Sequence, residues 1–141
     1  MTQEDKELLL KDLCARLPYG VKLRMSSENN GHLLASTVTL DIYHLHRYML
    51  DGGYYYGGKF YKIPGFDLLP YLHSMSSMTK EQKKEYQYIT ERWMYDSSYS
   101  ISDSIDWLNK NHFDYRGLIE KGLAIDATGK NIYMDLPDTY E

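Results

Sequence analysis

Residues 105–125, with the sequence IDWLNKNHFDYRGLIEKGLAI, carry the densest set of structure-specifying side chains in the chain. The apolar residues with helical spacing around its start are Ile101, Ile105 and Leu108, with Trp107 beside them. Ser102 or Ser104 can cap such a helix. Asp103 and Asp106 fall in its first turn, where the positive helix end favours acids. We therefore expect a short amphipathic helix here.

The second half of this stretch predicts another helix followed by a strand. Asp114 can offer its carboxylate to a helix N-terminus, and Gly122 suits the left-handed residue that ends a helix. Residues 123–125 then form an apolar run typical of a buried strand. The residues of the stretch expected in the core are Trp107, Leu108, Leu118 and Ile119.

The composition indicates one compact domain. With 141 residues, of which 43% are hydrophobic, the chain is long enough for one core and too short for two ordinary domains. Charged residues make up 26% and the formal net charge is -4, which favours neither disorder nor general attraction to nucleic acid or anionic membrane. The single Cys14 excludes an internal disulfide, and we expect it to be a buried thiol in a reducing, cytoplasmic compartment. The acidic start of the chain is unlike a signal peptide, and no membrane anchoring is expected.

Upstream of the C-terminal stretch, the chain begins with a predicted helix and continues as a β-rich region. Thr2 and Asp5 form an approximate capping box for a helix over 3–17, which Pro18 ends. The apolar face of that helix consists of Leu9, Leu10, Leu13, Cys14 and Leu17. The predicted strands cover residues 21–25, 32–40, 41–50, 54–56 and 59–63, with a loop over 26–31. In the first of them Val21, Leu23 and Met25 are expected to face inward.

The remaining segments complete the predicted architecture. Residues 68–72 read as an apolar bridge with room for one helical turn, and Thr79 with Gln82 caps a helix over 80–95. That helix is expected to bury Tyr86, Ile89 and Trp93. The fold class is therefore α+β, with a small bent antiparallel sheet or an SH3-like open barrel between helices. The predicted divisions of a single domain over 1–141 are a helix at 3–17, a β-rich part at 21–63, a helical part at 79–122, a short hairpin at 123–134 and a tail at 135–141.

Three blocks of the sequence carry a resemblance to a known family. The blocks are LLLKDLCARLPYGVK, LLPYLHSMSSMTKEQKKEY and WLNKNHFDYRGLIEKGLAI. Together they resemble a family of uncharacterised small proteins of gut Bacteroidetes and their phages and prophages. The resemblance implies a shared fold and a bacterial or phage-infected cytoplasm, and it supplies no functional residue. Where members of that family have an arginine after Pro-Tyr-Leu, this chain has His73, so no anion-binding role is carried over to that position.

Two histidines are the candidates for a metal site. His44 and His46 are two residues apart, so both would point to one side of a strand, as two ligands of some metal sites do. A third ligand would come from His32, His73 or Asp41. The chain has no cysteine ligands and no helix motif with glutamate, so we predict no bound metal and no cofactor. His112 and Asp114 have ordinary explanations in packing and capping, and the chain lacks a nucleophile motif.

The compositional outlier is tyrosine, and it defines the predicted binding surface. The chain has 15 Tyr against three Phe and two Trp, and tyrosine is enriched both at interfaces and in strands. Aromatic and basic residues are interleaved in one segment, and they are Arg47, Tyr48, Tyr54, Tyr55, Tyr56, Lys59 and Tyr61, with Lys62 at its end. The alternative is that alternate tyrosines pack in the core while the lysines keep a strand edge soluble.

Three functions follow from these residues, in descending order of support. The first is a non-enzymatic protein-interaction module, an accessory protein of a phage or mobile element that binds a host or viral protein through its tyrosine-rich face. The second is a protein that binds or sequesters a small nucleotide-like anion. The third is a metal-dependent enzyme that uses His44 and His46. A pocket with converging cations would favour the second function, and clustered histidines would favour the third.

Overall fold

The computed structural model describes residues 2–29, 32–49, 53–62, 67–92, 94–95 and 100–133, and within these ranges it leaves out the side chains of 27–29, 32–34, 47–48, 53–56, 60–62 and 67. The helices of this part are α1 (Gln3–Arg16), α2 (Ile42–Met49), α3 (Lys80–Arg92) and α4 (Ile101–Lys110), with the 3-10 turns η1 (Leu17–Tyr19) and η2 (Met75–Ser77). The strands are β1 (Lys22–Asn29), β2 (His32–Thr39), β3 (Gly53–Tyr56), β4 (Lys59–Lys62), β5 (Asp67–Ser74), β6 (Phe113–Asp114) and β7 (Ile125–Asp126). The predicted α+β class with an N-terminal helix is confirmed.

Strand β5 is the centre of the main sheet. Its first half pairs antiparallel with β1, and β2 extends the sheet beyond β1. Its second half pairs in parallel with two short strands, with β7 at Tyr71 and Leu72 and with β6 at His73 and Ser74. The sheet is therefore mixed instead of wholly antiparallel as expected, and it is not closed.

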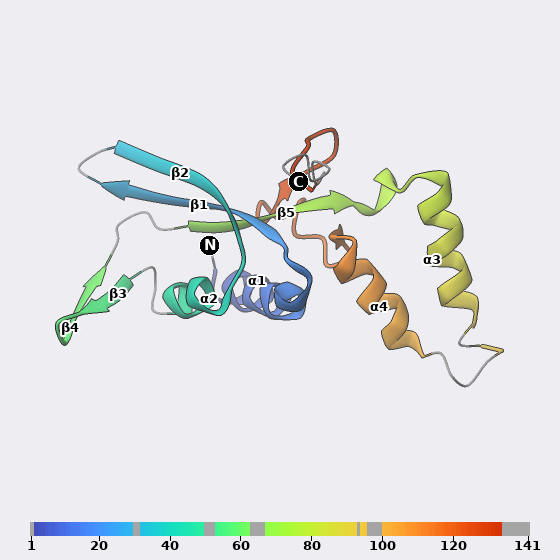
Figure 1. Ribbon diagram of the computed structural model, residues 1–141, viewed down its shortest axis with the longest axis horizontal. Coiled ribbons are helices and arrows are strands. Elements are labelled where there is room, and N and C mark those ends of the chain that lie inside the picture. The colour runs from blue at the N-terminus through green and yellow to red at the C-terminus, as the bar shows by residue number, and fades with distance from the viewer. Residues whose placement is uncertain are drawn as a thin grey trace, which may run out of the picture.

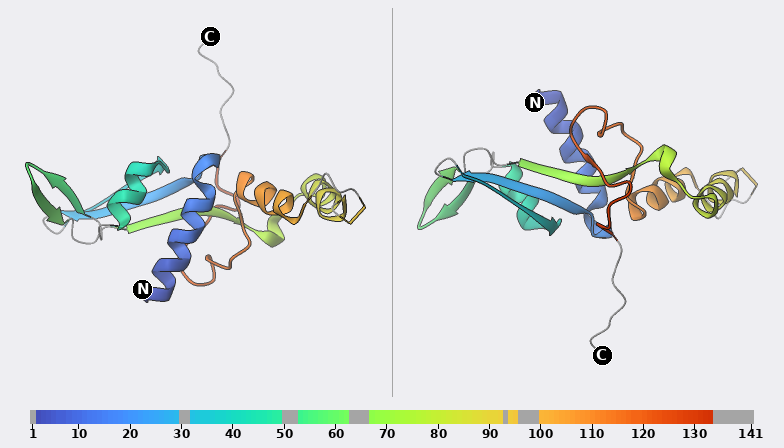
Figure 2. Two further views of the ribbon diagram at one scale, coloured as in Figure 1. Left: turned by 90° about the horizontal axis from the view of Figure 1, so that it is seen from below. Right: turned by 90° about the horizontal axis from the view of Figure 1, so that it is seen from above.

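The molecule is elongated around this sheet (Figure 1). The β3–β4 hairpin lies at one end, the α3–α4 pair lies at the other, and α1 and α2 lie together on one side of the strands (Figures 1 and 2). No helix among the residues described has both the length and the apolar composition needed to cross a membrane. The long strands β1, β2 and β5 thus connect two ends of different structure.

Two apolar clusters stabilise the fold. The first contains Leu9, Leu13, Val21, Leu23, Leu40, Leu45, Leu68, Leu72, Leu118, Leu123 and Ala124. The second contains Trp107, Leu108 and Phe113, with Met75, Met78, Tyr86, Ile89 and Tyr115 packed against them. The predicted burial of Trp107, Leu108 and Leu118 is confirmed, and Ile119 is partly buried against the first cluster. Trp107 lies parallel to Phe113 with ring centres 5.7 Å apart, so the second cluster is built on aromatic stacking.

Helix α1 begins as predicted but buries a different face. Its Thr2–Asp5 capping box is present, and Leu9 and Leu13 are fully buried. Asp12 and Arg16 are buried beside them, which turns the inward stripe away from Cys14. Cys14 is exposed, so the expectation of a buried thiol is wrong.

The segment expected as a strand over 41–50 is instead helix α2. Asp41 accepts a hydrogen bond from the backbone N–H of His44 at 3.0 Å, as an N-cap residue does. Leu45 is buried in the first cluster and holds the helix against the sheet. The alternation of aromatic and histidine residues predicted a strand, because that prediction did not take the capping role of Asp41 into account.

The apolar bridge predicted over 68–72 is wrong as well, since it is the centre of β5. Leu68, Pro70 and Leu72 are fully buried there, and Pro70 pairs with Leu23 of β1. A strand buried on both faces has a continuous apolar sequence, which periodicity alone cannot distinguish from a helical turn. The loop predicted over 26–31 is shorter than expected, because β1 continues to Asn29 and β2 begins at His32.

The region after α4 keeps its predicted cap but not its predicted elements. Asp114 accepts hydrogen bonds from the backbone N–H groups of Leu118 and Ile119, both at 2.9 Å, and Gly122 has φ 73. Residues 118–122 form turns instead of a helix. The C-terminal hairpin is also wrong, because β7 pairs in parallel with β5 and residues 131–133 form no strand. Residue 134 and the predicted tail lie outside the described residues, as does Trp93.

At α4 the predicted caps Ser102 and Ser104 are replaced by Ser100. Ser100 forms a capping box with Asp103, and Ser104 is buried with its hydroxyl 3.2 Å from that of Thr90. The helix therefore presents a different face from the one expected, and Ile101 is 66% exposed. The other predicted capping box, between Thr79 and Gln82 before α3, is present and the helix ends at Arg92.

Candidate anion-binding pocket

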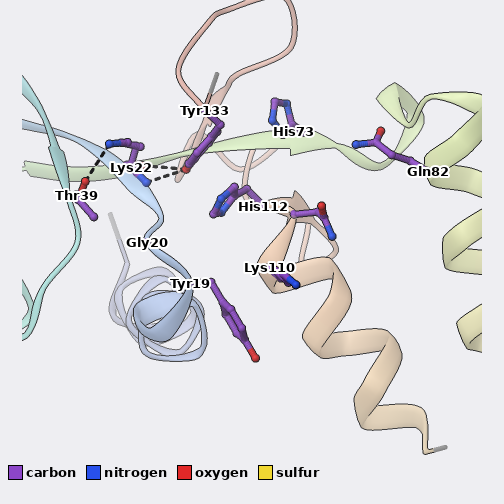
Figure 3. Close-up of a pocket in the computed structure, with 10 residues that line it drawn as sticks. Tyr19, Gly20, Lys22, Thr39, His73, Gln82, Lys110, His112 and Tyr133 are labelled. Atoms are coloured by element: carbon purple, nitrogen blue, oxygen red, sulfur yellow. Dashed lines mark hydrogen bonds between the residues drawn. The ribbon is translucent and has the colours of Figure 1, made fainter. Parts of the chain in front are cut away.

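A hollow of about 520 Å³ lies where β1, β5 and the ends of α1 and α4 meet (Figure 3). Its lining comes from Tyr19, Gly20, Lys22, Thr39, His73, Gln82, Lys110, Asn111, His112 and Tyr133. These residues belong to segments far apart in the sequence, and nine of the ten carry a polar side chain. Its volume falls within the range of small-molecule sites. We refer to this hollow as the pocket.

Two chain reversals at helix ends shape one side of the pocket. Pro18 lies in η1 after α1, and Gly20 follows with φ 68, a left-handed conformation that glycine adopts without strain. A Cβ atom at Gly20 would meet no atom within 4 Å, so the space beside it is open. The second reversal follows α4, which ends at Lys110. Asn111 caps this helix, and His112 turns the chain into β6.

A tyrosine hydroxyl completes the sheet where β1 and β5 separate. The last pair of their ladder is Leu23 with Pro70, and the next residues are Lys22 and Tyr71. The Tyr133 hydroxyl lies between these two, accepting from the Lys22 N–H at 2.8 Å and donating to the Tyr71 carbonyl at 2.7 Å. Burial raises the pKa of Tyr133 well above its usual value, so the hydroxyl stays protonated at neutral pH. The separation of the strands therefore leaves no broken backbone hydrogen bond at this place.

His112 lies at the centre of the lining (Figure 3). Its ring stacks on Tyr133 with centres 3.8 Å apart and planes at 13°, and its backbone carbonyl accepts from the His73 N–H at 2.8 Å. Burial, together with the positive charges of Arg16 and Lys22, lowers the pKa of His112 to about 4. The imidazole is therefore neutral at physiological pH.

The charges that remain in the lining at neutral pH are positive. Lys22 and Lys110 have no carboxylate within ion-pair distance among the residues described, and Lys22 Nζ is 3.0 Å from the Thr39 hydroxyl oxygen. Burial also lowers the pKa of His73, which the charge of Asp126 raises only in part. The described residues that line the pocket include no aspartate or glutamate, and Asp126, whose charge acts on His73, lies outside that set. Two lysines in such a polar lining are an arrangement suited to an anionic ligand.

A buried ion network supports the wall behind His112. Arg16 and Asp12 are fully buried, with Arg16 Nε 2.8 Å from Asp12 Oδ2, and Arg116 Nη1 lies 2.9 Å from Asp12 Oδ1. Arg16 Nη2 also donates to the Phe113 carbonyl at 2.6 Å. Helix α1 is thereby fastened to the strand that follows His112, and two guanidinium groups share one carboxylate.

The residues predicted as the binding surface lie elsewhere in the fold. Arg47 and Tyr48 belong to α2, while Tyr54, Tyr55, Tyr56, Lys59 and Tyr61 belong to the β3–β4 hairpin. The predicted strands of this hairpin and its Gly57-Gly58 turn are confirmed, although it forms a separate two-stranded sheet. Lys59 is exposed, and the other six side chains lie outside the described residues. Their role as a binding surface stays a prediction.

The geometry expected for a metal site at His44 and His46 is wrong. Two residues that are two apart in a helix point to nearly opposite sides, unlike the same pair in a strand. His44 instead receives the backbone N–H of Asp41 at Nδ1, at 3.2 Å, and His46 is exposed. Within the described ranges, no group of three or more His, Cys, Asp or Glu residues is placed to hold a metal ion.

Sequence reasoning missed four residues that define the pocket, namely Lys22, His73, His112 and Tyr133. The predicted packing role of His112 is present in its stack on Tyr133, but nothing local indicates that the two residues meet. The one available signal is the Asn-His pair at the end of α4, where a glycine is the usual residue. Comparison of the chain with protein-family models, with curated proteins and with solved structures finds no match to any of them.

Proposed function

We propose that the protein binds a small organic anion in the pocket. The observation that carries this proposal is the presence of Lys22 and Lys110 in one polar hollow, where the described lining residues include no acid. This was the second of the three functions drawn from the sequence. It now rests on different residues from those that the sequence singled out.

The two lysines line the pocket from different elements, Lys22 from β1 and Lys110 from the last turn of α4, and the Lys22 ammonium group is directed to Thr39 (Figure 3). Lys110 also complements the negative end of the α4 dipole, so it has a structural reason to be there. Lys22 donates from its ammonium group to the hydroxyl of Thr39, the residue that faces it in β2. An anion in the pocket would pair with the ammonium group of Lys22 or of Lys110, and added salt would weaken that attraction.

Calorimetric titration at low ionic strength tests the proposal with inorganic phosphate, ribose 5-phosphate and the four common nucleoside 5′-monophosphates as probes. We expect at least one of them to bind and the affinity to fall with added salt. The variants Lys22→Met and Lys110→Met keep an unbranched apolar stem and remove the charge. Each should weaken binding about tenfold or more, since a hydrogen bond to a charged group contributes about 1.5–3 kcal/mol.

The matched control is Lys84→Met, because Lys84 is an exposed lysine of α3 outside the pocket lining. That variant should bind as the unchanged protein does. Absence of binding for every probe, or unchanged affinity when Lys22 and Lys110 are replaced together, would contradict the proposal.

A protein-binding function remains a second candidate because large apolar side chains are exposed at the α3–α4 end. They include Tyr88, Met94, Tyr95 and Ile101. The β3–β4 hairpin extends away from the sheet at the opposite end (Figure 1). Large apolar side chains that are exposed together are typical of surfaces that bind other proteins.

Capture of a partner from extracts of the producing cells distinguishes the two surfaces. Changing Tyr54 and Tyr56, or Tyr55, to Ser together with Arg47→Ala should abolish capture while the melting temperature stays nearly unchanged. Retained capture would exclude the tyrosine-rich segment, and the double change Met94→Ser with Ile101→Ser would then test the α3–α4 end. A large fall in melting temperature would instead place the tyrosines in the core.

A further inference from the structure

The backbone of His112 is in a conformation that the fold does not require of a histidine. It has φ 62 and is the only residue other than glycine with positive φ in the described part of the chain. It follows Asn111, the C-cap of α4, at the position where a left-handed glycine commonly ends a helix. Glycine would adopt this conformation freely, whereas a residue with a Cβ is strained there. The structure therefore keeps an imidazole at a place where glycine would serve the backbone better.

The protein itself uses only part of this imidazole. One face is covered by Tyr133. The Nδ1 atom is buried and has no hydrogen-bond partner among the described residues, which is unfavourable for a polar atom. The low pKa of the ring keeps it uncharged, so it remains one donor and one acceptor on a flat aromatic ring. A ring that is strained, desolvated and incompletely bonded is typical of a binding site.

The second face of His112 is directed to the open part of the pocket. In Figure 3 Tyr133 lies on one side of the ring, and Tyr19, Gly20 and Lys110 lie on the other side. The space beside Gly20 is open, because an added Cβ there would contact nothing within 4 Å. The pocket therefore offers an aromatic face between the lysine from β1 and the lysine from α4.

Building on the anion-binding function proposed above, we infer that the ligand is a nucleoside phosphate whose base stacks on the free face of His112 and whose phosphate pairs with Lys22 or Lys110. Stacking on histidine and tyrosine rings is a common way for proteins to hold bases. An aliphatic anion would use the lysines and leave the ring face without a contact.

The decisive comparison is between each nucleoside 5′-monophosphate and ribose 5-phosphate, which has the same phosphate and sugar but no base. In the unchanged protein we expect at least one nucleotide to bind about tenfold or more tightly than ribose 5-phosphate, a factor equal to about 1.4 kcal/mol of stacking. The variant His112→Gly removes the ring and suits the left-handed backbone. It should bring the affinity for that nucleotide down to that of ribose 5-phosphate while changing the affinity for ribose 5-phosphate less than twofold.

A second variant, His112→Asn, tolerates the same backbone and should lose the same factor. His46→Ala, at an exposed histidine of α2, is the matched control and should bind as the unchanged protein does. Equal affinity for nucleotides and ribose 5-phosphate, or an unchanged nucleotide preference in both His112 variants, would overturn this inference and leave the anion-binding function standing. Failure of all the probes to bind would overturn both.

Discussion

The two halves of β5 differ in almost every respect. The first half pairs antiparallel with β1, and its Leu68 and Pro70 are fully buried in the apolar core. The second half pairs in parallel with β7 and β6, and its His73 lines the pocket. The change between them falls at Tyr71, whose carbonyl accepts the Tyr133 hydroxyl instead of a strand neighbour.

This difference separates a tightly paired part of β5 from the part that lines the pocket. Where β5 is paired continuously with β1, its inward face is packed and leaves no space for a ligand. When the neighbour changes, the strands separate and polar side chains fill the opening, provided that every backbone group still has a partner. In this protein the first half of β5 packs only into the core, whereas the second half buries Leu72 in the same core and places His73 beside the pocket.

The largest expected effect comes from removing the Trp107 side chain, which packs beside the second half of β5. This residue is buried and stacks on Phe113, which pairs with His73 of β5. Trp107→Ala should lower the free energy of unfolding by about 3–5 kcal/mol, because it leaves a large cavity. Urea unfolding measures the change. The control Tyr95→Ala, at an exposed aromatic residue, should change it by less than about 0.5 kcal/mol, and an equal effect of both would contradict the placement.

The next effect concerns Arg16, which links α1 to β6 beside the second half of β5. Asp12→Asn keeps the shape of the side chain but leaves the buried Arg16 without its charge partner. We expect a loss of about 3 kcal/mol in the free energy of unfolding, since breaking a buried ion pair strands a charge. Asp106→Asn, at an exposed aspartate of α4, serves as the control. Similar stability of the two variants would show that the network does not join α1 to the pocket wall.

The charge state of His112 predicts how stability depends on pH. Its pKa in the folded protein is about 4, below the value of 6.5 expected in the unfolded chain. As the pH falls through this window the unfolded chain takes up the proton first, so stability is lost between about pH 6.5 and 4. The loss from this group should be about 2 kcal/mol, allowing for screening around a half-buried ring.

The variant His112→Asn should lack that part of the loss, and unfolding titrations of both proteins at pH 7.5 and 4.5 measure the difference. Groups common to both proteins cancel in this comparison. The charges that act on His112 are those of Arg16, His73 and Lys22, and all three remain in the variant. An identical pH dependence in the two proteins would contradict the neutral, buried state of the ring.

The smallest expected effect tests the junction between the halves. Tyr133→Phe keeps the ring that stacks on His112 and removes the hydroxyl between Lys22 and Tyr71. We expect a loss of about 1 kcal/mol in urea unfolding, because two backbone groups lose their partner and water replaces part of it. The exposed Tyr88→Phe should be neutral. If Tyr133→Phe is also neutral, the hydroxyl does not hold the two strands together.

The sequence predicted those parts of the fold that short-range signals determine. The capping boxes at Thr2 and Thr79, the cap at Asp114 and the turn at Gly57-Gly58 each depend on residues within a few positions of one another. These signals act through local hydrogen bonds and backbone preferences, so they can be read without knowing the rest of the structure. They placed α1, α3 and the β3–β4 hairpin correctly.

The parts that were missed depend on contacts between distant segments. The role of β5 follows from its position between β1, β6 and β7, and an apolar run such as 68–72 does not disclose its neighbours. The pocket needs His112 to meet Tyr133, Lys22 to lie near both, and Gly20 to leave space beside them. The tyrosine-rich segment attracted attention because its residues are adjacent in sequence, whereas the pocket residues are adjacent only in space.

The most direct test of the pocket as the binding site is a two-dimensional ¹H–¹⁵N NMR titration with each of the four nucleoside 5′-monophosphates. The account predicts that at least one of them produces saturable shifts in the amide signals of Gly20, Lys22, His73 and His112, while the signals of β3 and β4 stay in place. Shifts confined to the β3–β4 hairpin, or no shift with any nucleotide, would contradict it.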